Sequence, residues 1–342
     1  MFSKILKYCI LSIAIFLWLQ AYSPLIYKST GLFPDDYRFG DLYRLSYLSD
    51  FKEKASKCPT IKSEYSEQNV NLFIIGDSFT EAERVNINDF NVGNYTYTHW
   101  AKQADIQLDT NKRNILILET VERTAKDHFS QKAENFKIEN KNSQEVKNQQ
   151  SWKQKLKENV TDLVKFIFPK GIEERLEHTL FNYDFFLHFR EVKAQLNHHI
   201  FGRVEHKVVL SKDEKHIFYS EEADSTNEHS AFYPVSQEEI DKFVLNINET
   251  REAYLKAGFD EVYLSVIPNK VSILSPELGK YNHLIERIET DKRLQIPIID
   301  TYKDFKKSPD KIYLKSDTHW SCAGRDIWLE KVNKIIKKKP TE

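Results

Sequence analysis

The segment 71–81, NLFIIGDSFTE, constrains the fold of this chain more than any other. Its apolar run at 72–75 ends at Gly76, which is typical of a buried parallel strand that stops at a turn. Asp77 and Ser78 come next, and such residues commonly begin a helix. The pattern therefore predicts a strand, a turn at Ser78 and a helix after it. Ser78 would lie where unpaired backbone amides and the positive end of the helix dipole meet.

This placement suits a serine nucleophile, because the hydroxyl and part of an oxyanion hole would share one turn. The string Gly-Asp-Ser is common by itself, however. The alternative is a capped turn in which Asp77 and Ser78 only satisfy backbone donors. The segment leaves both interpretations open.

Other short apolar runs alternate with amphipathic stretches. Strands are predicted at 114–118, 260–267 and 295–300, and helices at 236–257, 278–291 and 323–336. This alternation predicts an α/β fold, a three-layer sandwich of flavodoxin-like type with a mostly parallel sheet between helices. Ligands of such sheets bind beyond the carboxyl ends of the strands, so the charged residues at 119–123 are site candidates.

The composition changes between about 125 and 239, where Lys, Glu, Asn and Gln are frequent. We expect a largely helical insertion there, with helices at 152–168 and 173–189 and a hairpin at 207–220. Its histidines lack the spacing of metal ligands, and we predict no metal site. The prediction is thus one domain over 28–342, interrupted by this insertion.

Residues 1–27 carry an apolar run that follows Lys4 and Lys7. The run is short for a membrane span and lacks a small-x-small cleavage site, so a signal anchor and a cleaved signal peptide both remain open. A buried helix of a soluble domain is the third alternative. Two lysines before the run place the amino terminus in the cytoplasm and the rest outside. We expect a single amino-terminal span with an extracytoplasmic domain, periplasmic or on the cell surface.

The charge of the chain is balanced, with 50 basic and 51 acidic residues, which gives no indication of nucleic-acid binding. No dinucleotide-binding or P-loop glycine pattern occurs, so no cofactor is expected. Cys9 lies in the apolar run. Cys58 and Cys322 could pair outside the cytoplasm or stay free.

Near the carboxyl end, Asp317 and His319 stand two positions apart in the run SDTHW. With Ser78 they supply the three groups of a hydrolytic triad. An imidazole can take the serine proton at neutral pH, and a carboxylate on its other nitrogen fixes the tautomer. The alternative is a capping Asp beside a structural His packed against Trp320.

The two motifs together, GDSFT at 76–80 and DTHW at 317–320, resemble those of the SGNH hydrolases, specifically the alginate O-acetyltransferase-like (DHHW-type) branch. Further matching segments are LETVER at 118–123, SVIPNK at 265–270 and IYLKSDTHWSCAG at 312–324. One residue separates Asp from His, as in the acetyltransferase branch. The Asp-x-His element follows the serine, however, as in ordinary SGNH hydrolases.

The resemblance implies that Ser78 is the nucleophile, His319 the base and Asp317 its orienting acid, with the Ser78 amide as one oxyanion donor. Clear glycine and GxND asparagine blocks of the superfamily are absent. The candidates for further oxyanion or substrate contacts are Asp77, Gly93, Arg123, Asn269 and Trp320. For Gly93 the alternative is an ordinary turn.

The function that the resemblance implies is an extracytoplasmic, serine-dependent O-acyltransferase, with acetyl as the expected group. It would modify a cell-surface or exported polysaccharide through an acyl-Ser78 intermediate, and an integral membrane acyltransferase would be the partner that supplies the acyl group. The alternatives are a carbohydrate esterase with the same triad and a noncatalytic polysaccharide-binding or assembly protein.

Overall fold

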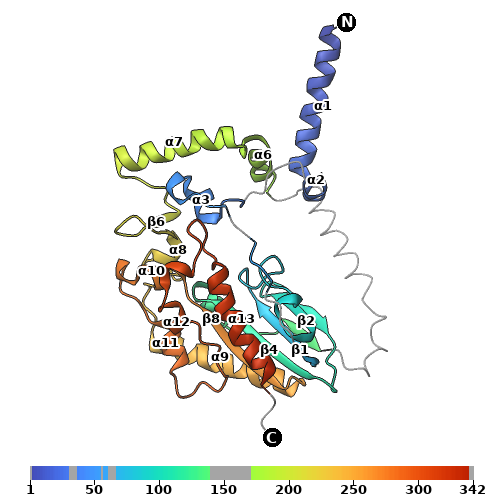
Figure 1. Ribbon diagram of the computed structural model, residues 1–342, viewed down its shortest axis with the longest axis vertical. Coiled ribbons are helices and arrows are strands. Elements are labelled where there is room, and N and C mark those ends of the chain that lie inside the picture. The colour runs from blue at the N-terminus through green and yellow to red at the C-terminus, as the bar shows by residue number, and fades with distance from the viewer. Residues whose placement is uncertain (1, 31–36, 55–56, 61–66, 139–170, 339–342) are drawn as a thin grey trace. The chain divides into compact units, whose positions relative to one another are not determined.

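The computed structural model describes residues 2–30, 37–54, 57–60, 67–138 and 171–338 (Figure 1). The chain forms two units. The first comprises Met1–Arg38, Tyr47–Asp50 and Lys141–Arg203, and the second comprises Phe39–Ser46, Phe51–Asn140 and Val204–Glu342. The boundary differs from the insertion predicted at about 125–239, because residues 125–140 and 204–239 belong to the second unit. The helix predicted at 152–168 lies outside the described residues.

The second unit is built on a four-stranded parallel sheet with the order β2-β1-β4-β8. Its strands are β1 (Glu67–Gly76), β2 (Val92–His99), β4 (Arg113–Val121) and β8 (Glu261–Ile267). The strands predicted at 72–75, 114–118 and 260–267 are confirmed. The sequence analysis missed β2, a half-buried edge strand in which Tyr and Thr alternate.

The strand predicted at 295–300 is wrong as a full strand. Only Ile298 forms a bridge there, to Leu264 of β8. Pro297 has no backbone N–H to donate, which keeps this segment from extending the sheet.

Helices cover both faces of the sheet, as the predicted three-layer sandwich requires. Phe73 of β1 packs on Phe259, which packs on Tyr254 of α9 (Gln237–Lys256). On the other face, Trp328 of α13 (Cys322–Lys337) donates a hydrogen bond to Ser265 of β8 at 2.9 Å. The sheet register places Phe73 level with Val262 of β8, three residues before Ser265, and side chains an odd number of residues apart point to opposite faces.

The predicted helices at 236–257 and 323–336 correspond to α9 and α13. Ser236 caps α9 in a reciprocal capping box with Glu239, as a Ser three residues before a Glu predicts. The helix predicted at 278–291 is shorter, with α11 at Leu284–Glu289. The remaining short helices are α3 (Asp41–Ser46), α4 (Ala125–His128), α8 (Ser220–Ala223), α10 (Lys270–Leu274) and α12 (Tyr302–Phe305).

Two smaller sheets complete the second unit. The strands β3 (Ala104–Ile106) and β5 (Phe136–Ile138) pair in parallel. The hairpin predicted at 207–220 is confirmed as β6 (Val208–Leu210) and β7 (Ile217–Tyr219). Cys58 and Cys322 form a disulfide, which settles the alternative that the sequence left open and ties the first turn of α13 to the segment before β1.

The first unit is helical, with α1 (Phe2–Tyr22), α2 (Pro24–Thr30), α6 (Ile172–Phe181) and α7 (Asp184–Phe201). The helix predicted at 173–189 is therefore two helices, interrupted at Asn182 and Tyr183. Within α1, Lys4–Tyr22 is long and apolar enough to cross a membrane, a test that a signal sequence also passes.

Candidate active site

Ser78, His319 and Asp317 form one hydrogen-bonded line in the α/β unit. His319 Nε2 lies 2.8 Å from Ser78 Oγ, and His319 Nδ1 lies 2.5 Å from Asp317 Oδ1. With the proton on Nδ1, the imidazole donates to Asp317 and accepts from the serine hydroxyl. The structure thus brings together the three side chains that the sequence placed in a triad.

Asp317 is buried, and burial by itself would raise the pKa of its carboxyl group. The hydrogen bonds from the His319 side chain and backbone, together with the charge of a protonated His319, hold that pKa below its ordinary value. Asp317 is therefore ionised at neutral pH. An ionised carboxylate in this position favours the Nδ1–H tautomer and stabilises the imidazolium that forms when His319 takes a proton.

The turn that carries Ser78 differs from the prediction. No helix follows β1; residues 78–84 form successive turns instead. Asp77 Oδ1 accepts from the Phe79 amide and Asp77 Oδ2 from the Val121 amide of β4, both at 2.9 Å. The bond to Phe79 is a local one of the kind that competes with helix formation, and the bond to Val121 ties the turn to β4, so the predicted helix and its dipole at Ser78 are wrong.

Glu119 of β4 fixes the same turn from the neighbouring strand. Its Oε2 accepts from the Asp77 amide at 3.0 Å and from the Thr80 hydroxyl at 2.7 Å. Gly76 leaves the room for this contact, since a Cβ there would lie 2.7 Å from Glu119 Oε2 and 2.1 Å from Thr80 Oγ1. Burial, and then the nearby Asp77, raise the pKa of Glu119 well above its ordinary value, which favours the neutral acid.

This arrangement predicts different outcomes for two substitutions of Glu119. Glu119→Gln keeps an acceptor for both donors and should change stability by less than about 1 kcal/mol. Glu119→Ala leaves the buried Asp77 amide and Thr80 hydroxyl without this acceptor. It should therefore lower the free energy of unfolding by about 2–4 kcal/mol. Urea denaturation of the two variants checks this. Equal losses would show that Glu119 does not act through these hydrogen bonds.

The loop that carries Asp317 and His319 is held by residues that the sequence analysis did not identify. Asp41, at the start of α3, accepts from the Thr318 amide at 2.8 Å and from its hydroxyl at 2.5 Å, and its own amide donates to Asp317. Burial and the charge of Asp317 raise the pKa of Asp41. Gly40, at φ +88°, allows this approach, because a Cβ would lie 2.3 Å from the Ser316 carbonyl oxygen.

Lys270 clamps the same loop from α10. Its buried Nζ donates to the carbonyl oxygens of Leu314, Lys315 and Asp317 at 2.8, 3.0 and 3.1 Å. Burial lowers the pKa of Lys270 to about 8. The triad loop is therefore fixed by a carboxylate on one side and an ammonium group on the other.

Asp41, Asp317 and His319 also have potential metal-ligating atoms within 4.8 Å of one another, the one group of this kind among the described residues. Their hydrogen bonds with one another and with Thr318 account for this proximity.

Four of the five further candidates lie in the Ser78 turn, contact its Phe79 or contact a residue that does. Asp77 has both carboxylate oxygens occupied by backbone amides, so it shapes the turn. The Arg123 guanidinium lies 5.8 Å from the centre of the Phe79 ring and pairs with buried Glu222 at 2.6 Å. Asn269 accepts from the Arg123 amide, while its buried Nδ2 has no partner in the described part of the chain.

The fifth candidate lies farther from the turn. Gly93 lies near the amino end of β2, six residues before His99, which pairs with Gly76. It is thus about 20 Å along the strand from the Ser78 turn, and its proposed approach to a ligand there is wrong. Its lack of a side chain is explained by β1, because a Cβ would lie 2.3 Å from the Gln68 carbonyl oxygen.

Trp320 is 4% exposed and packs against Phe79 and Trp328. The ring therefore supports the His319 loop from the core and offers little surface to a substrate. This burial contradicts the selection of Trp320 as a substrate contact. The Ser78 amide has no hydrogen-bond partner among the described residues, so it is available to an oxyanion.

Glu122 joins the end of β4 to α10 beside this site. Its Oε2 accepts from the Asn269 amide at 2.9 Å and from Ser272 at 2.6 Å, and its Oε1 accepts from the Tyr281 hydroxyl at 3.0 Å. Burial raises the pKa of Glu122 to about 7, and these hydrogen bonds only partly offset the effect. The residue therefore titrates near neutrality.

This pKa predicts a pH dependence of stability. Glu122 has an ordinary pKa of 4.5 and a folded-state pKa of about 7, so the folded state binds the proton more tightly. The resulting stabilisation is complete below pH 4.5 and is lost as the pH rises through 7. Relative to Glu122→Gln, the wild type should lose about 1–3 kcal/mol across this interval. Urea denaturation of the wild type and of Glu122→Gln at the two ends of this pH interval checks the prediction. If the free energies of unfolding of the two proteins changed equally with pH, the prediction would be contradicted.

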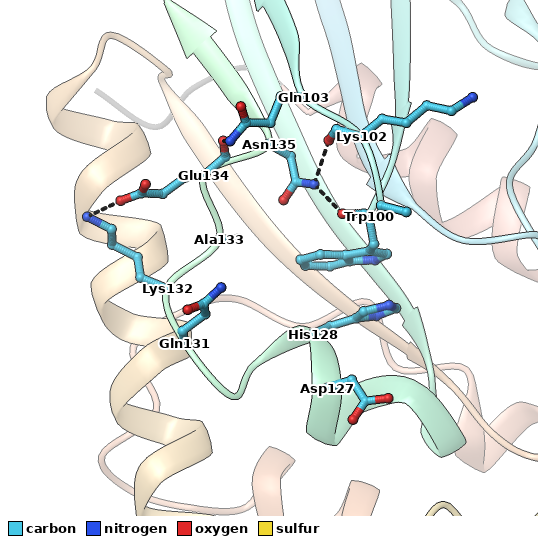
Figure 2. Close-up of a pocket in the computed structure, with 11 residues that line it drawn as sticks. Trp100, Lys102, Gln103, Asp127, His128, Gln131, Lys132, Ala133, Glu134 and Asn135 are labelled. Carbon is cyan, nitrogen blue, oxygen red and sulfur yellow. Dashed lines mark hydrogen bonds and ion pairs between the residues drawn. The ribbon is translucent and has the colours of Figure 1, made fainter. Parts of the chain in front are cut away.

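A hollow of about 600 Å³ lies beside Trp100, the residue that follows β2. Figure 2 shows the side chains that line it. The Trp100 amide donates to the Gly76 carbonyl, two residues before Ser78, at 3.1 Å. The Trp100 and His128 rings stack with centroids 4.3 Å apart, and most of the other lining side chains are polar, among them Asp127 and Gln131. Burial lowers the pKa of His128 to about 4, so this imidazole is neutral.

The geometry of the three side chains can support nucleophilic chemistry, because a base contacts the serine hydroxyl and a carboxylate orients the base. The comparisons with known proteins add no information. No protein-family model, curated protein or solved structure matches the chain.

Proposed function

We propose that this protein is a serine-dependent O-acyltransferase of SGNH type that modifies a cell-surface or exported polysaccharide, with acetyl as the group transferred. The observation that carries the proposal is the hydrogen-bonded line from Ser78 Oγ through His319 to Asp317. The motif resemblance to the alginate O-acetyltransferase-like branch supports the choice of reaction.

In the first half-reaction, Ser78 Oγ attacks the carbonyl carbon of an acyl ester while His319 Nε2 takes its proton. The ester bond then breaks, and His319 returns the proton to the leaving alcohol, which leaves acyl-Ser78. In the second half-reaction, His319 deprotonates a sugar hydroxyl that attacks the acyl carbon, and Ser78 recovers its proton. The Ser78 amide and Asn269 Nδ2 are the proposed donors to the oxyanion.

We place the protein in the membrane through α1, with the α/β unit outside the cytoplasm. The apolar helix of Lys4–Tyr22 supports the anchor, and the preceding lysines favour this orientation. The disulfide between Cys58 and Cys322 supports an oxidising compartment. An integral membrane acyltransferase is the proposed source of the acyl group.

The fate of the acyl group separates a transferase from an esterase, which would use the same side chains with water as the acceptor. The test supplies the full chain with an activated acetyl ester and an oligosaccharide in excess. Acetylated sugar formed faster than free acetate supports the transferase. Acetate release that the sugar does not affect would identify an esterase.

The hollow beside Trp100 is the proposed acceptor site, since an aromatic ring and polar side chains line a volume suited to a sugar. A double variant, Asp127→Ala with Gln131→Ala, should raise the KM for the oligosaccharide about 3–30-fold, because it removes polar contacts to the acceptor. The rate of Ser78 acylation should not change. Steady-state kinetics measure the KM for the oligosaccharide, and single-turnover kinetics measure the rate of Ser78 acylation. An unchanged KM would show that the acceptor binds elsewhere.

A further inference from the structure

Helix α7 presents an apolar stripe to its surroundings. The stripe recurs at the spacing of one helix face, and its side chains are between 43% and 68% exposed. They are Phe185, Phe189, Val192, Leu196 and Ile200. A water-soluble helix normally buries such a stripe in the core. The face is continuous over the length of the helix, which distinguishes it from scattered apolar side chains.

The opposite side of α7 is attached to the rest of the helical unit and carries Leu187, which is buried. Arg190 donates hydrogen bonds to the Tyr47 hydroxyl and to Glu177 of α6, and Gln195 donates to Ser49. The helix is thus attached through Leu187, Arg190 and Gln195, and the apolar stripe lies on the side that faces away from these contacts.

Contacts within the helical unit also hold α6, the helix before α7, against α1 and α2. Arg175 of α6 donates to the Ala21 carbonyl at 2.6 Å, and His178 of α6 bonds to Tyr27 of α2. The apolar part of α1 is exposed along its length but is buried at Gln20 and Ala21. In Figure 1, α6 lies against this end of α1 and continues into α7. If α1 spans the bilayer, α6 covers the point where it leaves the membrane.

We infer that α7 lies in the interface of the bilayer that α1 spans, with its apolar stripe inserted among the acyl chains. The inference rests on the membrane anchor of the proposed function. An apolar stripe that begins at the membrane-proximal end of a span is already close to lipid. Insertion to a depth of about 5–10 Å would bury all five side chains. The helix is then a second, peripheral attachment that restricts the rotation of the unit about α1.

The test uses the full chain with Cys9→Ser, so that one added cysteine can carry an environment-sensitive fluorophore. Phe185→Cys and Ile200→Cys place the label at the two ends of the stripe, and Lys212→Cys places it on the exposed β6–β7 turn as the control. The labelled proteins are reconstituted into phosphatidylcholine vesicles that contain lipids with a quencher high or low on the acyl chain.

The shallow quencher should reduce the fluorescence of both stripe labels about twofold more than the deep quencher does. The two labels should be quenched to similar extents, as expected for a helix parallel to the surface. Neither quencher should change the fluorescence of the control label at position 212. Unquenched stripe labels would overturn the inference, as would cross-linking between two copies through these cysteines. Extraction of the chain from vesicles by alkaline carbonate would overturn both the anchor and the inference. Acylation of Ser78 is measured separately, so its failure would affect the proposed reaction only.

Discussion

A Ser78→Ala variant is expected to lose acyl transfer by a factor of about 10⁴–10⁶, because no other group replaces the attacking oxygen. The fold should not change, since the Ser78 hydroxyl bonds to His319 Nε2 and to no other side chain in the described part of the chain. The rate of ester turnover measures the loss, and the thermal unfolding temperature measures the fold.

The matched control is Ser308→Ala, which makes the same chemical change at an exposed turn. It should keep wild-type activity. A Ser78→Ala variant that retained more than about a tenth of the activity would exclude Ser78 as the nucleophile.

Replacing Asp317 by Asn should lower the acylation rate by about 10²–10⁴-fold. The carboxylate accepts a hydrogen bond from the Nδ1–H group of His319. An amide NH₂ in its place would donate to Nδ1 and shift the ring proton to Nε2, where it faces Ser78 and prevents proton uptake. The variant should therefore bind substrate with little change in KM and lose kcat.

Asp41→Asn is the control for this effect, since the Asp41 carboxylate bonds to Thr318, whereas the imidazole bonds to Asp317. This variant should lower the acylation rate by about tenfold or less, because the loop that carries Asp317 and His319 becomes less rigid. Equal losses in the two variants would contradict a specific role for the Asp317 carboxylate.

The parallel core and the three triad side chains were predictable because their signals are local. Continuous apolar runs identified β1, β4 and β8, and the short Asp-x-His element identified the partner of Ser78. The edge strand β2 gave a weaker signal, since its half-exposed Tyr and Thr residues do not form an apolar run.

The residues that hold the site in place were not predictable, because they act over long sequence separations. Asp41 meets Asp317 and Thr318 across more than 270 positions, and Lys270 reaches three carbonyl groups that no side-chain pattern reveals. The predicted helix after Ser78 was wrong for a related reason. Glu119, on another strand, fixes Asp77 and Thr80 in a turn.

Intact-protein mass spectrometry tests the central claim most directly. The full chain is mixed with an activated acetyl ester, quenched in acid and compared with Ser78→Ala and His319→Ala. The account predicts a mass increase of a single acetyl group that maps to Ser78, is absent in Ser78→Ala and forms much more slowly in His319→Ala. A folded protein that gains no acetyl group and turns over no ester, or one that is acetylated equally well without Ser78, would contradict the proposed mechanism.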